Sequence, residues 1–156
     1  MNNRDVELLV YSPAWIRGLI HHFLSGVSSQ PNRSLKLELI YFVLPILYDD
    51  TLIEKLAKSN ITSTLSSLSS NVEIKVKLSN IKNRAFEFKK ETNSAMVLLG
   101  KENITIDNGF VFTPLPIKYQ ITSTPLKKHF KAAFNLGNIL AKSHYREVFM
   151  KFGVYS

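Results

Sequence analysis

The most apolar stretch of the chain, LELIYFVLPILYDDT over residues 37–51, limits the possible folds more than any other feature. Its uncharged run extends only from Leu39 to Tyr48, with Glu38 before it and Asp49 after it. A helix needs roughly 20 apolar residues to cross the hydrocarbon core of a bilayer. We therefore expect this segment in the core of a folded domain, and we expect no membrane among the partners of the chain.

Two secondary structures compete for this segment. The run Ile40–Val43 favours a strand, because β-branched and aromatic side chains fit a sheet. The apolar positions also recur at helical spacing, and Ser34 is a suitable N-cap. Because the intervening positions are apolar too, we predict a central helix over residues 35–48 that is buried on most sides. Pro45 is expected to kink this helix, since proline removes one backbone hydrogen bond.

Most of the remaining chain is also predicted to be helical. Ser12-Pro13 is typical of a helix start, and apolar residues at every fourth position predict an amphipathic helix over residues 13–26. The alternation in VEIKVKL leaves a strand possible there, but we favour a helix over residues 73–89. We further predict a short helix capped by Asp50 or Thr51, a short serine-rich helix capped by Thr62 or Ser63, and helices over residues 91–100, 124–143 and 146–154.

A β-hairpin is predicted between the last two long helices. Two short β-rich runs flank Asp107-Asn108-Gly109, and a tight turn needs residues that tolerate positive φ. Gly100 suits the end of the preceding helix, and a helix followed by a hairpin is typical of a winged helix-turn-helix. We therefore predict a mainly α fold: a single compact helical domain over residues 1–156 with a winged-helix-like β-hairpin near residues 103–113. An α+β fold is the alternative.

Positive charge is concentrated in the second half of the chain. Residues 1–78 carry 8 basic and 7 acidic side chains, whereas residues 79–156 carry 12 and 5, so the net charges are +1 and +7. A basic half indicates a polyanion or an acidic protein surface as partner, although merely solvated lysines give the same composition. In KNRAFEFKK and LKKHFKAAF basic residues are interleaved with aromatic ones. The candidate basic face, for nucleic acid or a protein partner, consists of Lys82, Arg84, Lys89, Lys90, Lys101, Lys127, Lys128 and Lys131.

No pattern of catalytic or metal-ligating residues is recognised. The chain has no cysteine, and His21 and His22 diverge by about 100° on a helix, which disfavours a shared metal ion. Asp49-Asp50 fits a helix boundary better than a metal pair, because a carboxylate suits the N-terminus of the next helix. Neither a glycine-rich phosphate loop nor a Gly-x-Ser-x-Gly elbow occurs. We predict no enzyme activity, no catalytic residue, no metal and no cofactor.

Two features indicate where the protein acts. The lack of cysteine fits a reducing compartment, although it does not require one. The first residues, MNNRDVELLV, do not combine a basic head with a long apolar run, so no secretory signal is recognised. We therefore expect a cytoplasmic protein.

Six segments follow one another in a characteristic order: SPAWIRGLIHHFL, LELIYFVLPILYDDTLIEKL, STLSSL, SAMVLLGKENITIDNGFVF, AFNLGNILAKS and EVFMKFGV. The last two contain Leu-Gly-x-x-x-Ala and Phe-x-x-x-Gly-Val motifs, here Leu136, Gly137, Ala141, Phe149, Gly153 and Val154. Over roughly residues 10–155, the order and spacing resemble the small middle component of bacterial three-component ABC systems, also called Lamassu-type anti-phage defence. Each motif is a packing pattern, and only the ordered set is specific.

This resemblance implies a non-enzymatic adaptor subunit. Such proteins sit between an SMC-like ABC ATPase and an effector, commonly a nuclease, and ATP belongs to the ATPase. The resemblance therefore implies an SMC-like ABC ATPase and an effector nuclease as partners, with DNA bound directly or through the complex. A stand-alone winged-helix DNA-binding regulator is the alternative, and a small hydrolase is a third and weaker one.

Overall fold

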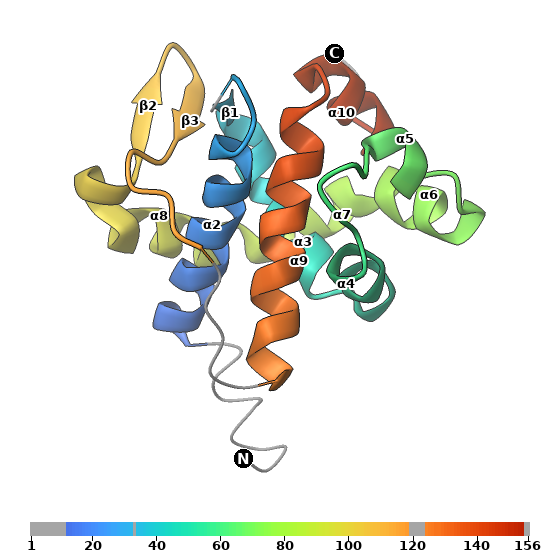
Figure 1. The fold of residues 1–156 in the computed structure, drawn as a ribbon, viewed down its shortest axis with the longest axis horizontal. Coiled ribbons are helices and arrows are strands. Elements are labelled where there is room, and N and C mark those ends of the chain that lie inside the picture. The colour runs from blue at the N-terminus through green and yellow to red at the C-terminus, as the bar shows by residue number, and fades with distance from the viewer. Residues whose placement is uncertain (1–11, 33, 119–123, 155–156) are drawn as a thin grey trace.

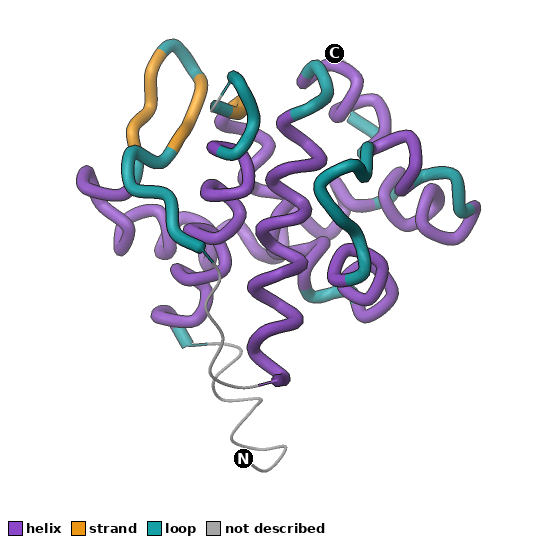
Figure 2. The backbone as a smooth tube through the Cα atoms, in the orientation of Figure 1, coloured by secondary structure: helices purple, strands orange, loops and turns teal. Residues whose placement is uncertain are grey.

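The computed structural model describes residues 12–32, 34–118 and 124–154, and most of these are helical (Figures 1 and 2). The prediction of a mainly α fold is confirmed. In chain order the helices are α2 (Pro13–Ser28), the 3-10 helix η1 (Leu37–Phe42), α3 (Val43–Leu47), α4 (Asp50–Ala57), α5 (Leu65–Leu68), α6 (Val72–Ser79), α7 (Ile81–Ala85), the 3-10 helix η2 (Phe86–Phe88), α8 (Lys89–Asn103), α9 (Thr124–Ala141) and α10 (Tyr145–Lys151). The strands are β1 (Leu35–Lys36), β2 (Thr105–Asp107) and β3 (Phe110–Phe112).

Helices α2 and α9 form the centre of the molecule and lie side by side (Figure 1). Ser12 caps α2, as the Ser-Pro pattern predicts, and its hydroxyl accepts a hydrogen bond from the backbone N–H of Trp15 at 3.2 Å. A Cβ atom on Gly26 would lie 2.0 Å from the backbone oxygen of Phe134, and one on Gly137 would lie 2.0 Å from that of Phe23. The two backbones therefore approach so closely that only glycine fits at these two positions.

The structure corrects the prediction of one kinked helix over residues 35–48. Leu35–Lys36 is a strand, Leu37–Phe42 is a 3-10 helix, and only Val43–Leu47 is an α-helix. The burial of the segment is nevertheless as predicted, because every residue from 39 to 47 except Tyr41 is buried. The strand is the part that hydrophobic spacing could not show, since its residues Leu35 and Lys36 pair with the distant residues Val111 and Phe110 of β3.

Pro45 explains why the helical part is divided. Proline has no backbone N–H, so it could not donate to the carbonyl of Tyr41 in a continuous α-helix. In the structure Pro45 is the third residue of α3, where a backbone N–H has no partner within the helix in any case. The helix therefore changes from 3-10 to α just before the proline.

The predicted hairpin is present, and it belongs to a larger sheet. Strands β2 and β3 are antiparallel, and the turn between them has positive φ at Asn108 (52°) and Gly109 (82°), as the sequence requires. Strand β1 pairs antiparallel with the other side of β3, so the strand order is β1-β3-β2. The sheet lies at the same end of the molecule as the C-terminus (Figure 2).

Between the core helices and the hairpin, the chain forms a run of short helices that we call the outer arc, residues 72–103. The predicted helix over residues 73–89 is helical but divided into α6, α7 and η2, and the strand alternative for VEIKVKL is wrong. Gly100 has φ 64° and interrupts α8 one turn before its end, close to where the sequence placed the helix terminus. In the view of Figure 1, the outer arc passes behind the α2–α9 pair.

Candidate functional site

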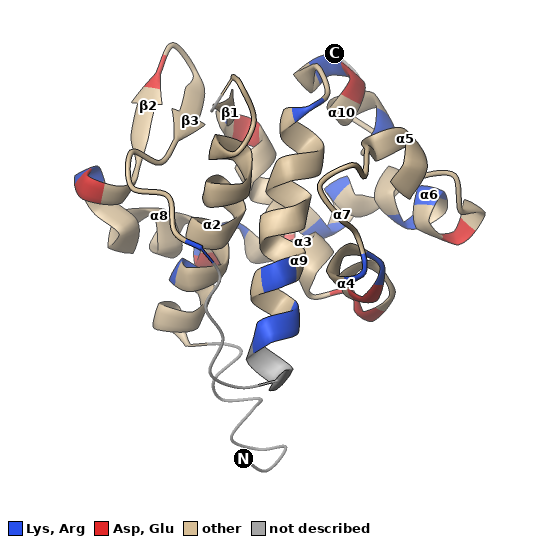
Figure 3. Cartoon of the chain, viewed as in Figure 1, with Lys and Arg blue, Asp and Glu red and all other residues tan. Residues whose placement is uncertain are grey.

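The predicted basic residues lie on three helices. Lys82 and Arg84 are on α7, Lys89, Lys90 and Lys101 are on α8, and Lys127, Lys128 and Lys131 are on α9. The structure brings the α9 lysines together on its first turns, where they form a blue band in Figure 3. Lys89 and Lys101 are separated by roughly 18 Å of helix, at 1.5 Å per residue. Both α8 and α9 pack against α2, so the predicted basic residues lie on helices of one helical assembly (Figure 1).

Two of these basic side chains are already engaged within the protein. Arg84 lies 3.6 Å from the carboxylate of Asp49, and its guanidinium stands 5.9 Å from the ring centre of Phe88. Lys128 forms an ion pair with Glu54 of α4. Arg84 therefore connects α7 to the corner between α3 and α4, and Lys128 connects α9 to α4.

Asp49, the ion-pair partner of Arg84, is the N-cap of α4. Its carboxylate accepts a hydrogen bond from the backbone N–H of Leu52 at 3.0 Å and from Lys77 at 3.0 Å. Burial, the largest single effect, would raise the pKa of Asp49, but the hydrogen bonds from Leu52, Lys77 and the backbone of Thr51 together with the charge of Lys77 lower the pKa below its ordinary value. The prediction of a helix boundary is confirmed, with Asp49 rather than Asp50 or Thr51 as the cap.

Metal-ligating side chains do not gather in the part of the chain that the structure describes. Among residues 12–32, 34–118 and 124–154, no group of three or more His, Asp or Glu side chains is placed to hold an ion. Nor does any helix in the same residues have the length and hydropathy needed to cross a membrane.

The outer arc exposes an unusual number of large apolar side chains. Val72 and Val76 lie one turn apart on α6 and are 75% and 53% exposed. Phe86 in η2 is 80% exposed, and on α8 Val97 and Leu98 are 79% and 48% exposed. Single exposed apolar residues are ordinary on a protein surface, whereas neighbouring ones, such as Val72 and Val76 on one side of α6, are the kind of surface that partner interfaces use.

A second surface feature lies on the outer face of the sheet. Val111 of β3 is fully buried against the core, and side chains alternate along a strand, so Phe110 and Phe112 face outward. The register places Lys36 of β1 and Asp107 of β2 on either side of Phe110. A cation, an aromatic ring and a carboxylate therefore form one row across the outer face of the sheet.

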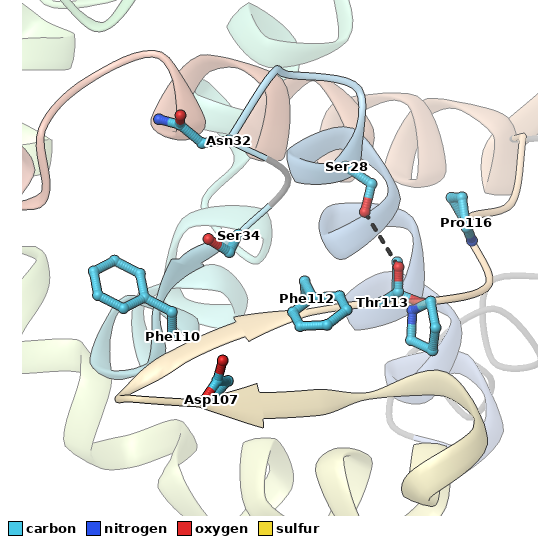
Figure 4. A pocket seen from close by; sticks show the side chains of 9 residues that line it. Ser28, Asn32, Ser34, Asp107, Phe110, Phe112, Thr113 and Pro116 are labelled. Atoms are coloured by element: carbon cyan, nitrogen blue, oxygen red, sulfur yellow. Dashed lines mark hydrogen bonds between the residues drawn. The ribbon is translucent and has the colours of Figure 1, made fainter.

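Two adjoining pockets lie along this face, and Asn32, Ser34 and Phe110 line both of them. The first pocket, of about 540 Å³, lies between the hairpin and the end of α2 (Figure 4). Its lining residues are Ser28, Asn32, Ser34, Asp107, Phe110, Phe112, Thr113, Pro114 and Pro116. The second pocket, of about 350 Å³, lies on the side of Phe110 that carries Lys36 and Tyr145.

Aromatic contacts hold Lys36 on its side of Phe110. Its ammonium group lies 5.4 Å from the ring centre of Phe110 and 5.4 Å from that of Tyr145. The two rings meet edge to face, with their centres 6.1 Å apart. Lys36 is therefore placed by two rings from β3 and α10, and the charge of this pocket is positive.

Comparison with protein families now identifies the chain. The profile of the ABC-three component (ABC-3C) system Middle Component 3 family matches residues 1–156. The chain belongs to this family. The resemblance to a middle component is thereby confirmed, and membership of a multi-component system implies that this middle component has protein partners. Comparisons with curated proteins and with solved structures gave no match.

The two surface features of the middle component were missed by sequence reasoning for different reasons. Hydrophobicity alone does not say which side of a helix is covered, so the sequence could not show that Val72, Val76 and Val97 are exposed. The row of Lys36, Phe110 and Asp107 depends on the pairing of β1 with β3, which the sequence of residues 35 and 36 does not indicate. A usable signal did exist in FVF after the turn, where alternation predicts that Phe110 and Phe112 share a face.

Proposed function

We propose that this middle component is a non-enzymatic adaptor subunit that bridges an SMC-like ABC ATPase and an effector nuclease in a cytoplasmic anti-phage or anti-plasmid defence complex. In this proposal the ATPase partner hydrolyses ATP, and the middle component transmits the state of the ATPase to the effector by direct contact. DNA meets the middle component directly or only through the complex. Membership of the ABC-3C middle component 3 family supports this proposal.

The observation that carries the proposal is the exposed apolar surface of the outer arc. Burial of a valine or phenylalanine side chain contributes roughly 1.5–3 kcal/mol. Val72, Val76 and Phe86 leave this contribution unused in the isolated chain, since each is more than half exposed. Association itself costs about 4–15 kcal/mol, so these three side chains suffice only as part of a larger interface of at least about 1,000 Å².

Co-expression with the neighbouring genes of the same locus tests the adaptor function. We expect the middle component to co-purify with the ABC ATPase, and the double substitution Val72→Asp and Val76→Asp to remove it from the complex. Substitution of the exposed Ile61 by aspartate, outside the outer arc, is the matched control and should leave the complex intact. A middle component that elutes alone when the ATPase is present would contradict the proposal.

A stand-alone winged-helix DNA-binding regulator is the second candidate, and one observation favours it. The order β1-β3-β2, with α8 directly before the hairpin, is the arrangement in which a winged helix places its recognition helix and wing. The exposed side of α8 speaks for a protein partner instead, because Val97 and Leu98 are apolar where a groove-reading helix presents polar or basic groups.

Salt dependence separates the two candidates. A DNA-binding regulator binds duplex DNA on its own, and its affinity falls steeply between low and physiological salt, because lysines release counterions from the phosphates. Substitution of Lys89, Lys90 and Lys101 by alanine should then reduce the salt slope by about one per lysine. Sequence-specific binding by the isolated chain would favour the regulator, whereas the adaptor function tolerates only weak and nonspecific binding.

A further inference from the structure

We propose that the pocket on the outer face of the β1-β3-β2 sheet binds a basic side chain, lysine or arginine, from an extended segment of a partner subunit. This inference rests on the adaptor function proposed above, and it names the chemistry of one contact. The pocket is the one drawn in Figure 4, between the hairpin and the end of α2.

The pocket offers a cation both an aromatic surface and a carboxylate. Phe110 and Phe112 lie two residues apart on β3, face outward, and line the pocket together. Asp107 lies opposite Phe110 in the register of the hairpin. Aromatic faces attract lysine and arginine, and a carboxylate beside the ring neutralises the charge.

The carboxylate of Asp107 is available to bind a cation. Among the described residues that line this pocket Asp107 is the only charged one, and its carboxylate forms no ion pair with another described residue. Lys36 is the cation across the sheet, but it lies on the other side of Phe110, held between Phe110 and Tyr145. The described lining of the pocket therefore carries a negative charge, on a protein whose formal net charge is +8.

The net charge of the protein does not prevent a cation from binding there. The Debye length at physiological ionic strength is about 8 Å, so distant lysines are largely screened. Contact with Asp107 occurs at much shorter range than that. The local carboxylate therefore decides which charge the pocket accepts, and the positive surroundings slow the approach of the basic segment more than they weaken its final contact.

The shape of the face favours an extended peptide over a small metabolite. Sites for small molecules usually enclose most of the ligand surface, whereas both pockets here are open to solvent. They adjoin each other at Phe110, and Asn32 and Ser34 line both of them. A peptide in extended conformation that crosses Phe110 would place one side chain beside Asp107 and another, of acidic character, beside Lys36.

The test measures the affinity of the middle component for its partner subunits, with the complex reconstituted from the full chains. We expect Asp107→Asn to weaken the complex by about tenfold and Asp107→Lys by more, because like charges then face each other. Asparagine is well tolerated before a tight turn, so the hairpin should remain folded. Asp50→Asn removes an exposed carboxylate on α4, outside both the outer arc and the pocket, and is the matched control, for which no loss is expected.

The outcomes separate this inference from the adaptor function. A complex that tolerates Asp107→Asn and Asp107→Lys as well as it tolerates Asp50→Asn overturns the inference and leaves the adaptor function standing. If no complex forms, the adaptor function fails, and the pocket is tested with N-acetyl-arginine amide followed by NMR of the full chain. Saturable shifts at Asp107, Phe110 and Phe112, absent with the uncharged citrulline analogue, support a basic-side-chain pocket, and their absence overturns it.

Discussion

The α2–α9 pair and the outer arc are both helical, but they differ in how much apolar surface they expose to solvent. In the pair, apolar residues such as Phe23 and Leu140 are fully buried, and two glycines let the backbones touch. In the outer arc, buried residues such as Leu78 and Leu99 alternate with Val72, Phe86 and Val97, which face solvent. The pair therefore leaves little apolar surface uncovered, whereas the outer arc has the exposed apolar side chains on which the proposed adaptor function depends.

The largest effect is expected where α2 and α9 touch. Gly137→Ala places a methyl group 2.0 Å from the backbone oxygen of Phe23, which only a separation of the helices can relieve. Overpacking of this kind costs typically about 1–3 kcal/mol, and here we expect at least the upper end because the obstacle is backbone. Urea denaturation measures the loss in the free energy of unfolding.

Gly18→Ala is the matched control for this substitution. Its methyl group would lie 3.1 Å from the ring edge of Phe130, a side chain that can shift. Alanine also has the higher helix propensity, by about 1 kcal/mol, so the net change should be small. Equal losses for Gly18→Ala and Gly137→Ala would contradict the account of the α2–α9 contact.

A smaller loss is expected at the junction of α9 with α4. The side-chain amide of Asn135 donates to the backbone oxygens of Leu56 (2.8 Å) and Ser59 (3.0 Å), so it caps the C-terminal end of α4. Asn135→Ala leaves both acceptors without this donor and should cost about 1–3 kcal/mol. Asn135→Asp should be at least as destabilising, since a carboxylate cannot donate, and a stable aspartate variant in thermal unfolding would refute the capping role.

Acid is expected to weaken the α2–α9 region through His22. Burial lowers the pKa of His22 below its ordinary value of 6.5, despite the hydrogen bond of its ring to the oxygen of Gly18. The unfolded chain therefore takes up the proton at higher pH than the folded protein does. Stability is fully present above pH 6.5 and is lost as the pH falls through the lower folded pKa.

Replacement of this histidine isolates its share of the pH dependence. His22 also stacks on Phe130 of α9, with the ring centres 4.1 Å apart, so His22→Gln should lower stability at neutral pH as well. The decisive readout is the slope of unfolding free energy between pH 7 and pH 5, which should flatten in the variant. An unchanged slope would assign the acid sensitivity to other groups.

The smallest effect on stability is expected in the outer arc. Val72→Asn and Val76→Asn change side chains that are mostly exposed, so the free energy of unfolding should stay within about 0.5 kcal/mol of the wild type. Binding to the partner should nevertheless weaken. A large loss of stability would show that these valines serve the fold, and the contrast with α2–α9 would then disappear.

Local patterns in the sequence predicted the helices and the hairpin, because their causes are local. Ser12-Pro13 starts α2, and Asn108-Gly109 makes the turn through positive φ. Helix caps were placed near the correct position, but neighbouring residues of the same chemistry cannot be ranked from sequence. Asp49 rather than Asp50, and Thr64 rather than Ser63, accept the capping hydrogen bonds.

What the sequence could not show depends on contacts between distant segments. The pairing of Leu35 with Val111 turns the start of the predicted helix into a strand, and no local propensity demands it. Arg84, a residue of the predicted basic face, likewise forms an ion pair with Asp49 and so connects α7 to the start of α4. In the sequence, Gly26 and Gly137 are only small residues within predicted helices, and nothing local shows that the two backbones touch there.

Hydrogen–deuterium exchange of the middle component, alone and in complex with its ABC ATPase, tests the central claim most directly. We expect amides of the outer arc, especially around Val76, Phe86 and Val97, to become protected in the complex. Amides of the α2–α9 pair should exchange slowly in both states. Protection confined to surfaces other than the outer arc, or no change on addition of the ATPase, would contradict the claim that this apolar surface is an adaptor interface.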